Sequence, residues 1–467
     1  MRVYEKYLQD KHYVATSFVP KGELDKIVEG SEKADIVEED PSDAARVEVP
    51  EDEDYEIKKT PSKIDRSKEP EKGPMPEVKV PEVWQSDLAN GIKIYGVEHD
   101  ELPLVNYELI LRGGHLGDSF EKPGVAYLTA SLMNEGTKQR TPEELEEAID
   151  FLGASIHIRS GRETILVKVN TLARNFEKTL ELVEEMLLEP RWDEEQFELA
   201  KTRTVNSIKR SRADANTVAS ITFNKLLYGD DHIFSIPNVG TVESVENITI
   251  DDLKAYYKKY FSPSVASFEI VGAVRPLRVQ RALQGLAGNW EAKEVELPEY
   301  ELPEPRDEAG VYFVDMPGAK QSALRVGYLC MERCAEDFYP ATVMNYKLGG
   351  AFASNINMML REEKGYTYGA RSGFSGTKTP GPFYASTSVV TDATLESFEI
   401  IRDLMEGVPR RDQRRGTGIH EERHPQVEHP EIRDHGQSPQ HALDDRLLRK
   451  TGGSSGTAGS DRPEHDT

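Results

Sequence analysis

Within residues 84–295, the spacing of apolar side chains changes repeatedly from two residues to three or four, and this change constrains the fold most. Tyr107, Leu109 and Leu111 alternate with their neighbours as in a half-buried strand. The same alternation returns between residues 156 and 169. Because stretches with helical spacing lie between such strands, the sequence predicts an α+β fold of repeated modules, each an antiparallel sheet packed with helices.

Helix boundary signals support this interpretation. Thr141, Pro142 and Glu144 supply an N-cap, a proline in the first turn and the glutamate of a capping box. The other elements expected in this module are helices over 176–187, from 194 after the cap Asp193 and over 215–227, and a closing strand at 268–271.

Residues 296–408 begin the same order of elements again. The stretch VYFVDMP, residues 311–317, predicts a strand that pairs with ALRVGYL, residues 323–329, across a turn at Pro317-Gly318. The elements expected next are a helix over 340–362, glycine-rich strands and a helix over 393–406. We therefore expect two successive copies of one module, of which the second is incomplete.

The N-terminal residues 1–30 have the pattern of the end of a preceding module. Tyr4 and Tyr7 have helical spacing, and residues 13–19 predict one strand. One helical turn and one strand cannot bury a core, so this segment requires a partner. Residues 31–83 are rich in Glu, Asp, Lys and Pro and predict an acidic, proline-rich linker.

Residues 409–467 differ in composition from the rest of the chain. They contain no Phe, Tyr or Trp and hold six of the eleven His. Either this is a disordered tail, or it is a frame-shifted translation. Back-translation of residues 421–449, read one base later, permits a sequence with the apolar spacing of a long helix. We favour the frame shift, in which Val408 or a neighbour is the last genuine residue.

The charge balance limits the class of partner. The formal net charge is −25, from 83 acidic and 58 basic residues. Nucleic acid is excluded as a partner because phosphate binding needs a basic surface. No stretch reaches the ~20 apolar residues of a transmembrane helix, and the N-terminus lacks the pattern of a signal peptide. The compartment stays unknown, because an upstream half could carry a signal.

Potential metal ligands are sparse. Cys330 and Cys334 have no companion His or Cys, and two ordinary thiols are the better interpretation. His115, His157 and His232 have no i, i+4 partner, so we interpret them as surface residues or as hydrogen-bonded core residues.

Residues 84–408 resemble the pitrilysin/insulinase-type zinc peptidases, the inverted zincins. The stretches that carry the resemblance are LPLVNYELILRGG, GVAYLTASLMNEGT, LLYGDDHIFSIPNVGTVESVENITIDDLKAYYKKYF, DMPGAKQSALRVG and LGGAFASNINMMLREEKGYTYGARSGFSG. The resemblance implies α+β modules that pair as two halves around a chamber. One half carries zinc, and the other contributes substrate-binding groups.

In the zinc-bearing half of that family, the segment that matches 124–137 holds H-x-x-E-H on a helix. Here the two histidine positions are Tyr127 and Ser131, and the glutamate position is Ala130. The distant glutamate ligand would fall at Asn206 or Ser207. Since every ligand and the general base are replaced, the resemblance implies no catalytic residue and no metal in this chain.

The second module carries the other signature of the family. An Arg and a Tyr seven residues apart follow a Gly-Gly pair, and Arg361 and Tyr368 match this spacing after Gly349 and Gly350. A guanidinium and a phenol can donate hydrogen bonds to a peptide carbonyl that gains negative charge. The resemblance assigns these four residues to substrate binding, whereas a structural Arg and Tyr would be the interpretation without it. Gly365 and Tyr366 are expected to shape the turn.

The sequence therefore predicts the accessory, substrate-holding half of a zinc-dependent endopeptidase that acts on peptides or unfolded segments. Its expected partners are a zinc-bearing half, fused upstream or separate, and a peptide. Two alternatives stay open: a non-catalytic peptide-binding or structural homologue, and a non-functional truncated fragment.

Overall fold

The structure is a computed structural model. It describes residues 2–12, 14–16, 19, 26–32, 73–74, 80–304 and 308–412. The chain divides into two units, residues 1–74 and 75–467, which are considered separately. The linker predicted over 31–83 and the tail predicted over 409–467 lie almost entirely outside the described residues.

The first unit contributes one short helix, α1 (Arg2–Tyr7), none of whose residues is buried. The strand predicted over 13–19 is not present in its described residues 14–16 and 19. Val14 is 95% exposed. A strand needs a neighbouring strand, and the described part of this unit contains none for it to pair with.

The second unit begins with a six-stranded sheet. Its strands are β1 (Trp84–Asp87), β2 (Lys93–Glu98), β3 (Leu104–Arg112), β4 (Ser155–Ser160), β5 (Thr164–Leu172) and β6 (Ala266–Gly272). They are ordered β1-β2-β6-β3-β5-β4, and every pair is antiparallel except β2 and β6. The sheet and its helices confirm the α+β class.

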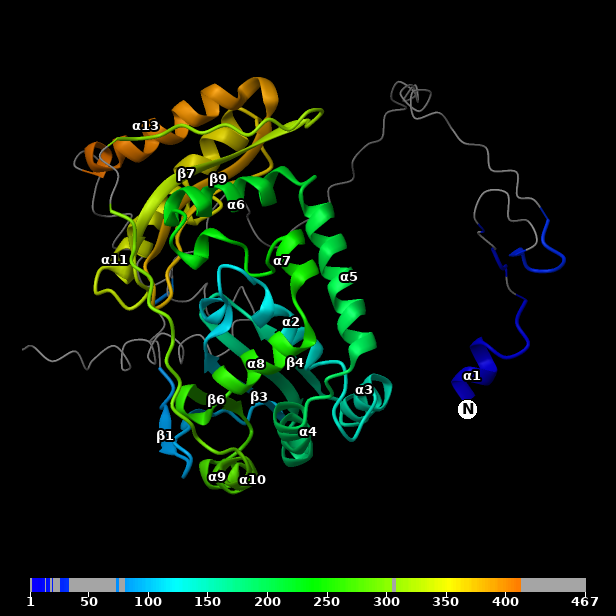
Figure 1. Ribbon diagram of the computed structural model, residues 1–467. Helices are drawn as coiled ribbons and strands as arrows, with labels where there is room; N and C mark the ends of the chain where they lie inside the picture. Colours follow the sequence, from blue (N-terminus) through cyan, green and yellow to red (C-terminus); the bar gives the residue numbers. More distant parts are fainter. Residues whose placement is uncertain are drawn as a thin grey trace, which may run out of the picture. The chain divides into compact units, whose positions relative to one another are not determined.

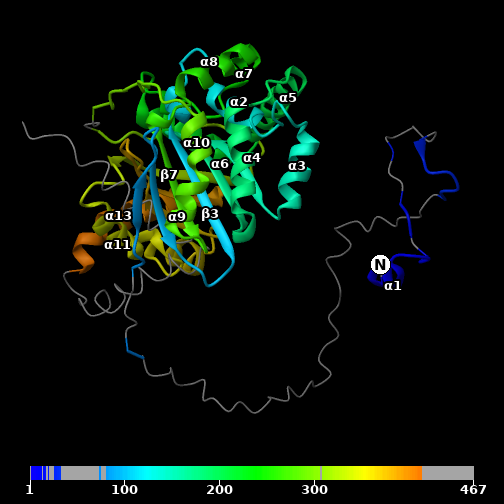
Figure 2. The ribbon, with the colours of Figure 1, turned by 90° about the horizontal axis from the view of Figure 1, so that it is seen from below.

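The module also contains nine α-helices among its described residues. They are α2 (Val125–Leu132), α3 (Pro142–Phe151), α4 (Phe176–Leu188), α5 (Glu194–Ser211), α6 (Ala215–Tyr228), α7 (Val242–Asn247), α8 (Ile250–Tyr260), α9 (Pro276–Ala282) and α10 (Gln284–Asn289). Short 3-10 turns complete the module: η3 (Gly114–Gly117), η4 (Ala173–Asn175), η5 (Ile233–Ser235) and η6 (Pro263–Val265). Figures 1 and 2 both show α3, α4 and α5 grouped together at one side of the sheet.

The core of this module follows the predicted alternation. Tyr107 lies opposite Val169 on one side and Ile270 on the other, and all three are buried. The Tyr107 ring stacks on Phe268, with centroids 5.2 Å apart, and meets Phe176 of α4 edge-on. Burial of the tyrosine raises its pKa well above the ordinary value.

The predicted helix boundaries are confirmed where caps were recognised. The Thr141 side chain accepts a hydrogen bond from the backbone N–H of Glu144, and the Glu144 side chain accepts one from Thr141. The Asp193 side chain caps α5 by accepting a hydrogen bond from the backbone N–H of Gln196. These local bonds satisfy backbone N–H groups that have no partner within the helix.

A second, three-stranded sheet follows, with β7 (Gln321–Met331), β8 (Ala370–Phe374) and β9 (Gly381–Val390) in the order β7-β9-β8. Both pairs are antiparallel. The other elements are α11 (Phe338–Asn345), π-helix η7 (Tyr346–Gly350), α12 (Asn355–Asn357), π-helix η8 (Met358–Glu363), η9 (Thr391–Ala393) and α13 (Thr394–Asp412). Figure 1 shows β7 and β9 between α13 and α6, a helix of the first module.

Two predictions for the second module were wrong. Residues 311–317 form no strand, and Phe313 is 85% exposed, because no described strand lies beside them to pair with. The single helix predicted over 340–362 is divided into two continuous helical segments, 338–350 and 355–363, because the chain leaves the helix at residues 351–354, directly after Gly349 and Gly350.

Among the described residues, no helix combines the length and apolar character that a bilayer crossing requires. Cys330 and Cys334 are free thiols, and burial raises the pKa of both.

Candidate functional site

A buried histidine and aspartate position the helix on which the family would carry its zinc motif. Asp118 accepts hydrogen bonds from the backbone N–H groups of Gly124 (2.9 Å) and Ala126 (2.8 Å), at the start of α2. His115 Nδ1 lies 2.9 Å from Asp118 Oδ2. Its Nε2 lies 3.0 Å from the carbonyl oxygen of Ile233 and 2.9 Å from that of Ile236. The pair therefore ties α2 to the loop that follows α6.

The three positions of the degenerate motif differ in their surroundings. Tyr127 is half-buried and lines a cavity, whereas Ala130 is packed in the core of the first module. Ser131 is half-buried and does not line the cavity. On α5, Ser207 lines the same cavity as Tyr127, while Asn206 is exposed and does not. The structure thus brings together Tyr127 and Ser207.

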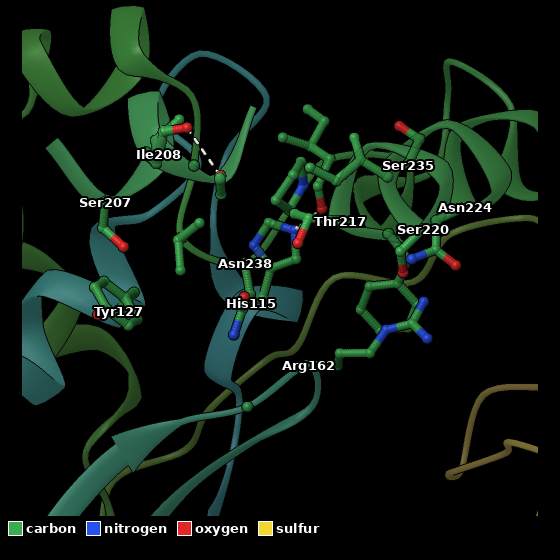
Figure 3. A pocket seen from close by; sticks show the side chains of 18 of the residues that line it. His115, Tyr127, Arg162, Ser207, Ile208, Thr217, Ser220, Asn224, Ser235 and Asn238 are labelled. Atoms are coloured by element: carbon green, nitrogen blue, oxygen red, sulfur yellow. Dashed lines mark hydrogen bonds between the residues drawn. The ribbon is translucent and has the colours of Figure 1, made fainter. Parts of the chain in front are cut away.

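This cavity has a volume of about 690 Å³. Its walls come from α2, α5, α6, the turn between β4 and β5, the loop over 233–240 and one residue of β7, Arg325. Figure 3 shows Tyr127 and Ser207 at one end of it, and Arg162 near Ser220 and Asn224 at the other. The cavity is therefore built mainly by the first module and completed by the second.

The lining carries positive charge only. Arg162 and Arg325 are its charged residues, and no Asp or Glu lines it. The Arg162 guanidinium lies 4.1 Å from the ring centroid of Phe234 and 4.9 Å from that of Tyr228. Its Nη2 atom is buried and has no hydrogen-bond partner in the described part of the chain. Arg325 lies 5.2 Å over the ring of Tyr384.

His232 lies beside this cavity and stays neutral near neutral pH. Its ring is 1% exposed and contacts Tyr228 and Tyr300. Burial, and secondarily the charge of Arg162, lowers the pKa of His232 to about 4. Its Nδ1 atom accepts a hydrogen bond from the backbone N–H of Phe234. His115 and His232 are thus hydrogen-bonded core residues, as predicted, and His157 is exposed on β4.

The donor set at the degenerate motif does not fit zinc. A phenol, a methyl and a hydroxyl replace two imidazoles and a carboxylate, and zinc in proteins is held by His, Cys, Asp or Glu. Arg162 and Arg325 add repulsion for any cation in the cavity. The described residues also contain no group of three or more His, Cys, Asp or Glu that could hold a metal ion.

The residues assigned to substrate binding lie in the second module, in and after the two π-helices. Tyr368 is 91% exposed. Arg361 lies 4.5 Å over the ring of Phe352, and its Nε atom is 3.2 Å from Glu362. Within the described residues, no hydrogen bond joins Arg361 to Tyr368. Both side chains are therefore available at the surface, and they do not form a preassembled pair.

The two glycines have close backbone neighbours. A side chain at Gly349 would overlap the hydroxyl and backbone nitrogen of Ser372 on β8, and one at Gly350 would approach Asn345. Packing between η7 and β8 therefore accounts for Gly349 without any ligand. In the turn that follows, Gly365 has φ +68° and the Tyr366 hydroxyl donates to Glu396 at 2.7 Å.

Sequence reasoning missed Arg162 and Arg325. Arg162 is in a hairpin turn, where a charged residue is ordinary, and no motif marks it. Arg325 left a weak signal, because it is the one charged residue within the strand stretch ALRVGYL.

Two family models match this chain. Residues 97–229 match "Insulinase (Peptidase family M16)", and residues 247–410 match "Peptidase M16 inactive domain". The "Non-peptidase homolog YmxG" of Helicobacter pylori is 23% identical over 318 residues, which are 66% of this chain and 72% of that protein. The "Uncharacterized zinc protease YmxG" of Bacillus subtilis is 22% identical over 296 residues, 62% of this chain and 70% of that protein.

A solved structure shows the same fold. The crystal structure of a peptidase M16 inactive domain from Pseudomonas fluorescens superposes with a TM-score of 0.70 at 23% identity. The superposition covers 79% of this chain and 87% of that one.

Proposed function

The chain belongs to the insulinase (M16) family of peptidases as a non-catalytic member, and from this premise we propose that it is the accessory half of a zinc-dependent endopeptidase. In this role it closes a chamber with a zinc-bearing half and holds a peptide or an unfolded segment. The observation that carries the proposal is the combination of a motif without zinc ligands at Tyr127, Ala130 and Ser131 with a half-buried Arg361 and an exposed Tyr368.

The proposed division of chemistry follows from the side chains. The zinc-bearing half supplies the metal, its water and a glutamate base. This chain supplies hydrogen-bond donors from Arg361 and Tyr368 to the carbonyl oxygen that becomes negative during attack. The phenol of Tyr368 is free to reach a ligand, being 91% exposed. The Arg361 side chain is held by Phe352 at one face, while its terminal nitrogens have no described partner.

The test is a peptidase assay with this chain alone and with a zinc-bearing M16 protein from the same genome. We expect no hydrolysis of an unfolded peptide by the chain alone, with or without added zinc, and hydrolysis by the mixture. The double variant Arg361→Ala/Tyr368→Phe should lower the activity of the mixture by roughly two orders of magnitude, the scale for loss of an oxyanion donor.

A matched control keeps this loss interpretable. Arg371→Ala/Tyr328→Phe removes an exposed Arg and a phenol hydroxyl from the same module and should leave the activity of the mixture unchanged. Zinc-dependent cleavage by the pure chain alone would overturn the proposal, as would equal losses in the two double variants.

A second candidate function is non-catalytic peptide binding. The name of the Helicobacter pylori relative, a non-peptidase homologue, favours it. Binding of an unfolded peptide by the chain alone, unchanged in Arg361→Ala/Tyr368→Phe, together with an inactive mixture, would select this function.

A further inference from the structure

The cavity beside the degenerate motif has the size of a ligand site. Its volume of about 690 Å³ falls within the range of small-molecule pockets, roughly 300–1,000 Å³. It is lined by elements of both modules, because α6 packs against β7 and Arg325 of β7 lines the cavity. Such a site between packed elements is a common position for a ligand.

The charge of the lining is opposite to that of the whole chain. The protein has a net charge of −25, yet two arginines and no carboxylate line this cavity. The acidic residues nearest in sequence have other partners. Asp118 binds His115 and the start of α2, and Glu163 accepts hydrogen bonds from the backbone N–H groups of Lys378 and Thr379.

Arg162 is the strongest sign of a ligand. Its cation is held over the rings of Phe234 and Tyr228, which fixes its position. The buried Nη2 has no described hydrogen-bond partner. A buried donor without an acceptor is unfavourable. The part of Arg162 that lines the cavity can donate a charge-assisted hydrogen bond to an anionic oxygen there.

Neutral and apolar groups surround the arginine. Figure 3 shows Ser220 and Asn224 of α6 close to the Arg162 guanidinium. Both can hydrogen-bond to an oxygen or an amide. Ile208, Ile221 and Phe234 add apolar surface to the same cavity. The lining therefore suits a ligand with one anionic end, amide groups and an apolar side chain.

We propose that this cavity binds a peptide carboxylate, with the anionic oxygens on Arg162 and the adjoining residue toward Ile208 and Ile221. The proposed anion site is thus at the end of the cavity opposite Tyr127 and Ser207, which stand at the zinc-ligand positions of the relatives. Binding here requires no zinc-bearing partner, so the inference stands apart from the proposed pairing. The carboxylate has two possible sources, a C-terminus or an acidic side chain.

The experiment is isothermal titration calorimetry of the full chain with three N-acetylated tripeptides. The first has a C-terminal leucine as the free acid, the second is its C-terminal amide, and the third has a central glutamate and an amide end. We expect the free acid to bind at least roughly tenfold more tightly than its amide, the scale for one charge-assisted hydrogen bond. Equal binding of the glutamate peptide and the free acid also supports the carboxylate site and identifies an acidic side chain as a source.

Variants assign the binding to the cavity. Arg162→Gln should weaken binding of the free acid by roughly tenfold or more. Arg325→Gln removes the second positive charge of the lining and should also weaken binding of the free acid. This variant provides the test if Arg162→Gln does not fold. The control is Arg159→Gln. Arg159 is exposed on β4, three residues before Arg162 and outside the cavity, so this variant should bind the free acid as the unchanged protein does.

Several outcomes would overturn the inference. These are no binding of the free-acid or glutamate peptide at millimolar concentration, equal affinity for the free acid and for both amide peptides, and full affinity in both folded Arg162→Gln and Arg325→Gln. Tighter binding of inorganic phosphate than of either carboxylate peptide would overturn the assignment to a carboxylate.

Discussion

The two sheets of the second unit repeat one strand order, but they differ in the number of strands that flank β3 in the first sheet and β7 in the second. In the first module β3 lies between β5 and β6, whereas in the described residues of the second module β7 pairs with β9 alone. The order β3-β5-β4 thus reappears as β7-β9-β8, and the chain described up to residue 412 contains no equivalent of β6 in the second sheet.

This difference explains the exposed segment before β7. In the first module β2 lies along the parallel strand β6, and its residues Ile94 and Tyr95 are buried. Residues 311–314 precede β7 as β2 precedes β3, yet they are exposed and form no strand. A short apolar stretch therefore becomes a strand only where a neighbouring strand offers hydrogen-bonding groups.

The largest expected effect comes from the aromatic centre of the first sheet. Phe268 on β6 is 1% exposed and stacks on Tyr107. Phe268→Ala should lower the free energy of unfolding by about 3–5 kcal/mol, since it leaves a cavity in a closed core. Urea unfolding, monitored by circular dichroism, measures this change in the free energy of unfolding.

Phe383→Ala on β9 is the comparison for the second sheet, whose core cluster is smaller and whose edge is open. We expect a smaller loss there. An equal or larger loss for Phe383→Ala would show that the second sheet is as tightly packed as the first.

A pH effect should act where the two modules meet. His232 belongs to the group of rings around Tyr228, whose hydroxyl donates to the carbonyl oxygen of Pro380 in the second module. The pKa of His232 is lowered from 6.5 to about 4 in the folded chain, so the unfolded chain binds more protons between these values. The stability is complete above pH 6.5 and should fall by about 3 kcal/mol as the pH drops to 4.

Thermal or urea unfolding from pH 7 to pH 4 measures this fall, with His232→Gln as the control. The variant cannot titrate at this position, so its curve should fall less steeply with acid. Identical pH dependence of the two proteins would rule out His232 as the group responsible.

The carboxylate of Glu163 is a second contact between the modules. It accepts hydrogen bonds from the backbone N–H groups of Lys378 (3.0 Å) and Thr379 (2.8 Å). Glu163→Ala should lower stability by about 1.5–3 kcal/mol, the scale for hydrogen bonds to a charged group. Hydrogen exchange should show faster exchange at residues 378 and 379.

The matched control is Glu146→Ala, because Glu146 is exposed on α3. Its effect on stability should stay within about 0.5 kcal/mol, as is usual for surface substitutions. Unchanged exchange at 378 and 379 in Glu163→Ala would mean that other contacts hold the modules together.

Local signals in the sequence predicted the first module well. The capping box at Thr141 and Glu144 and the alternation at Tyr107, Leu109 and Leu111 act over a few residues, so the sequence contains them entirely. The strand at 311–317 failed because it depends on a neighbour that the pattern does not specify. In general, a local sequence pattern does not specify which strand another strand will pair with.

The cavity could not be predicted because its residues are distant in sequence. Tyr127, Arg162 and Ser207 come from a helix, a hairpin turn and another helix, and Arg325 comes from the second module. The resemblance indicated that Tyr127 and Ser207 would meet. It gave no indication of the two arginines, which give the lining of the cavity a positive charge.

The smallest expected effect concerns close packing within the second module. A methyl group at Gly349 would overlap Ser372 on β8, whereas the space around Gly373 on the same strand is open. Gly349→Ala should therefore lower stability by about 1–3 kcal/mol through overpacking, while Gly373→Ala should change it by less.

Measuring the peptide affinity of Gly349→Ala distinguishes this packing role from the substrate contact predicted from the resemblance. If Gly349→Ala folds with lowered stability and full peptide affinity, packing alone explains the glycine. Lost affinity at unchanged stability would instead assign Gly349 to the substrate.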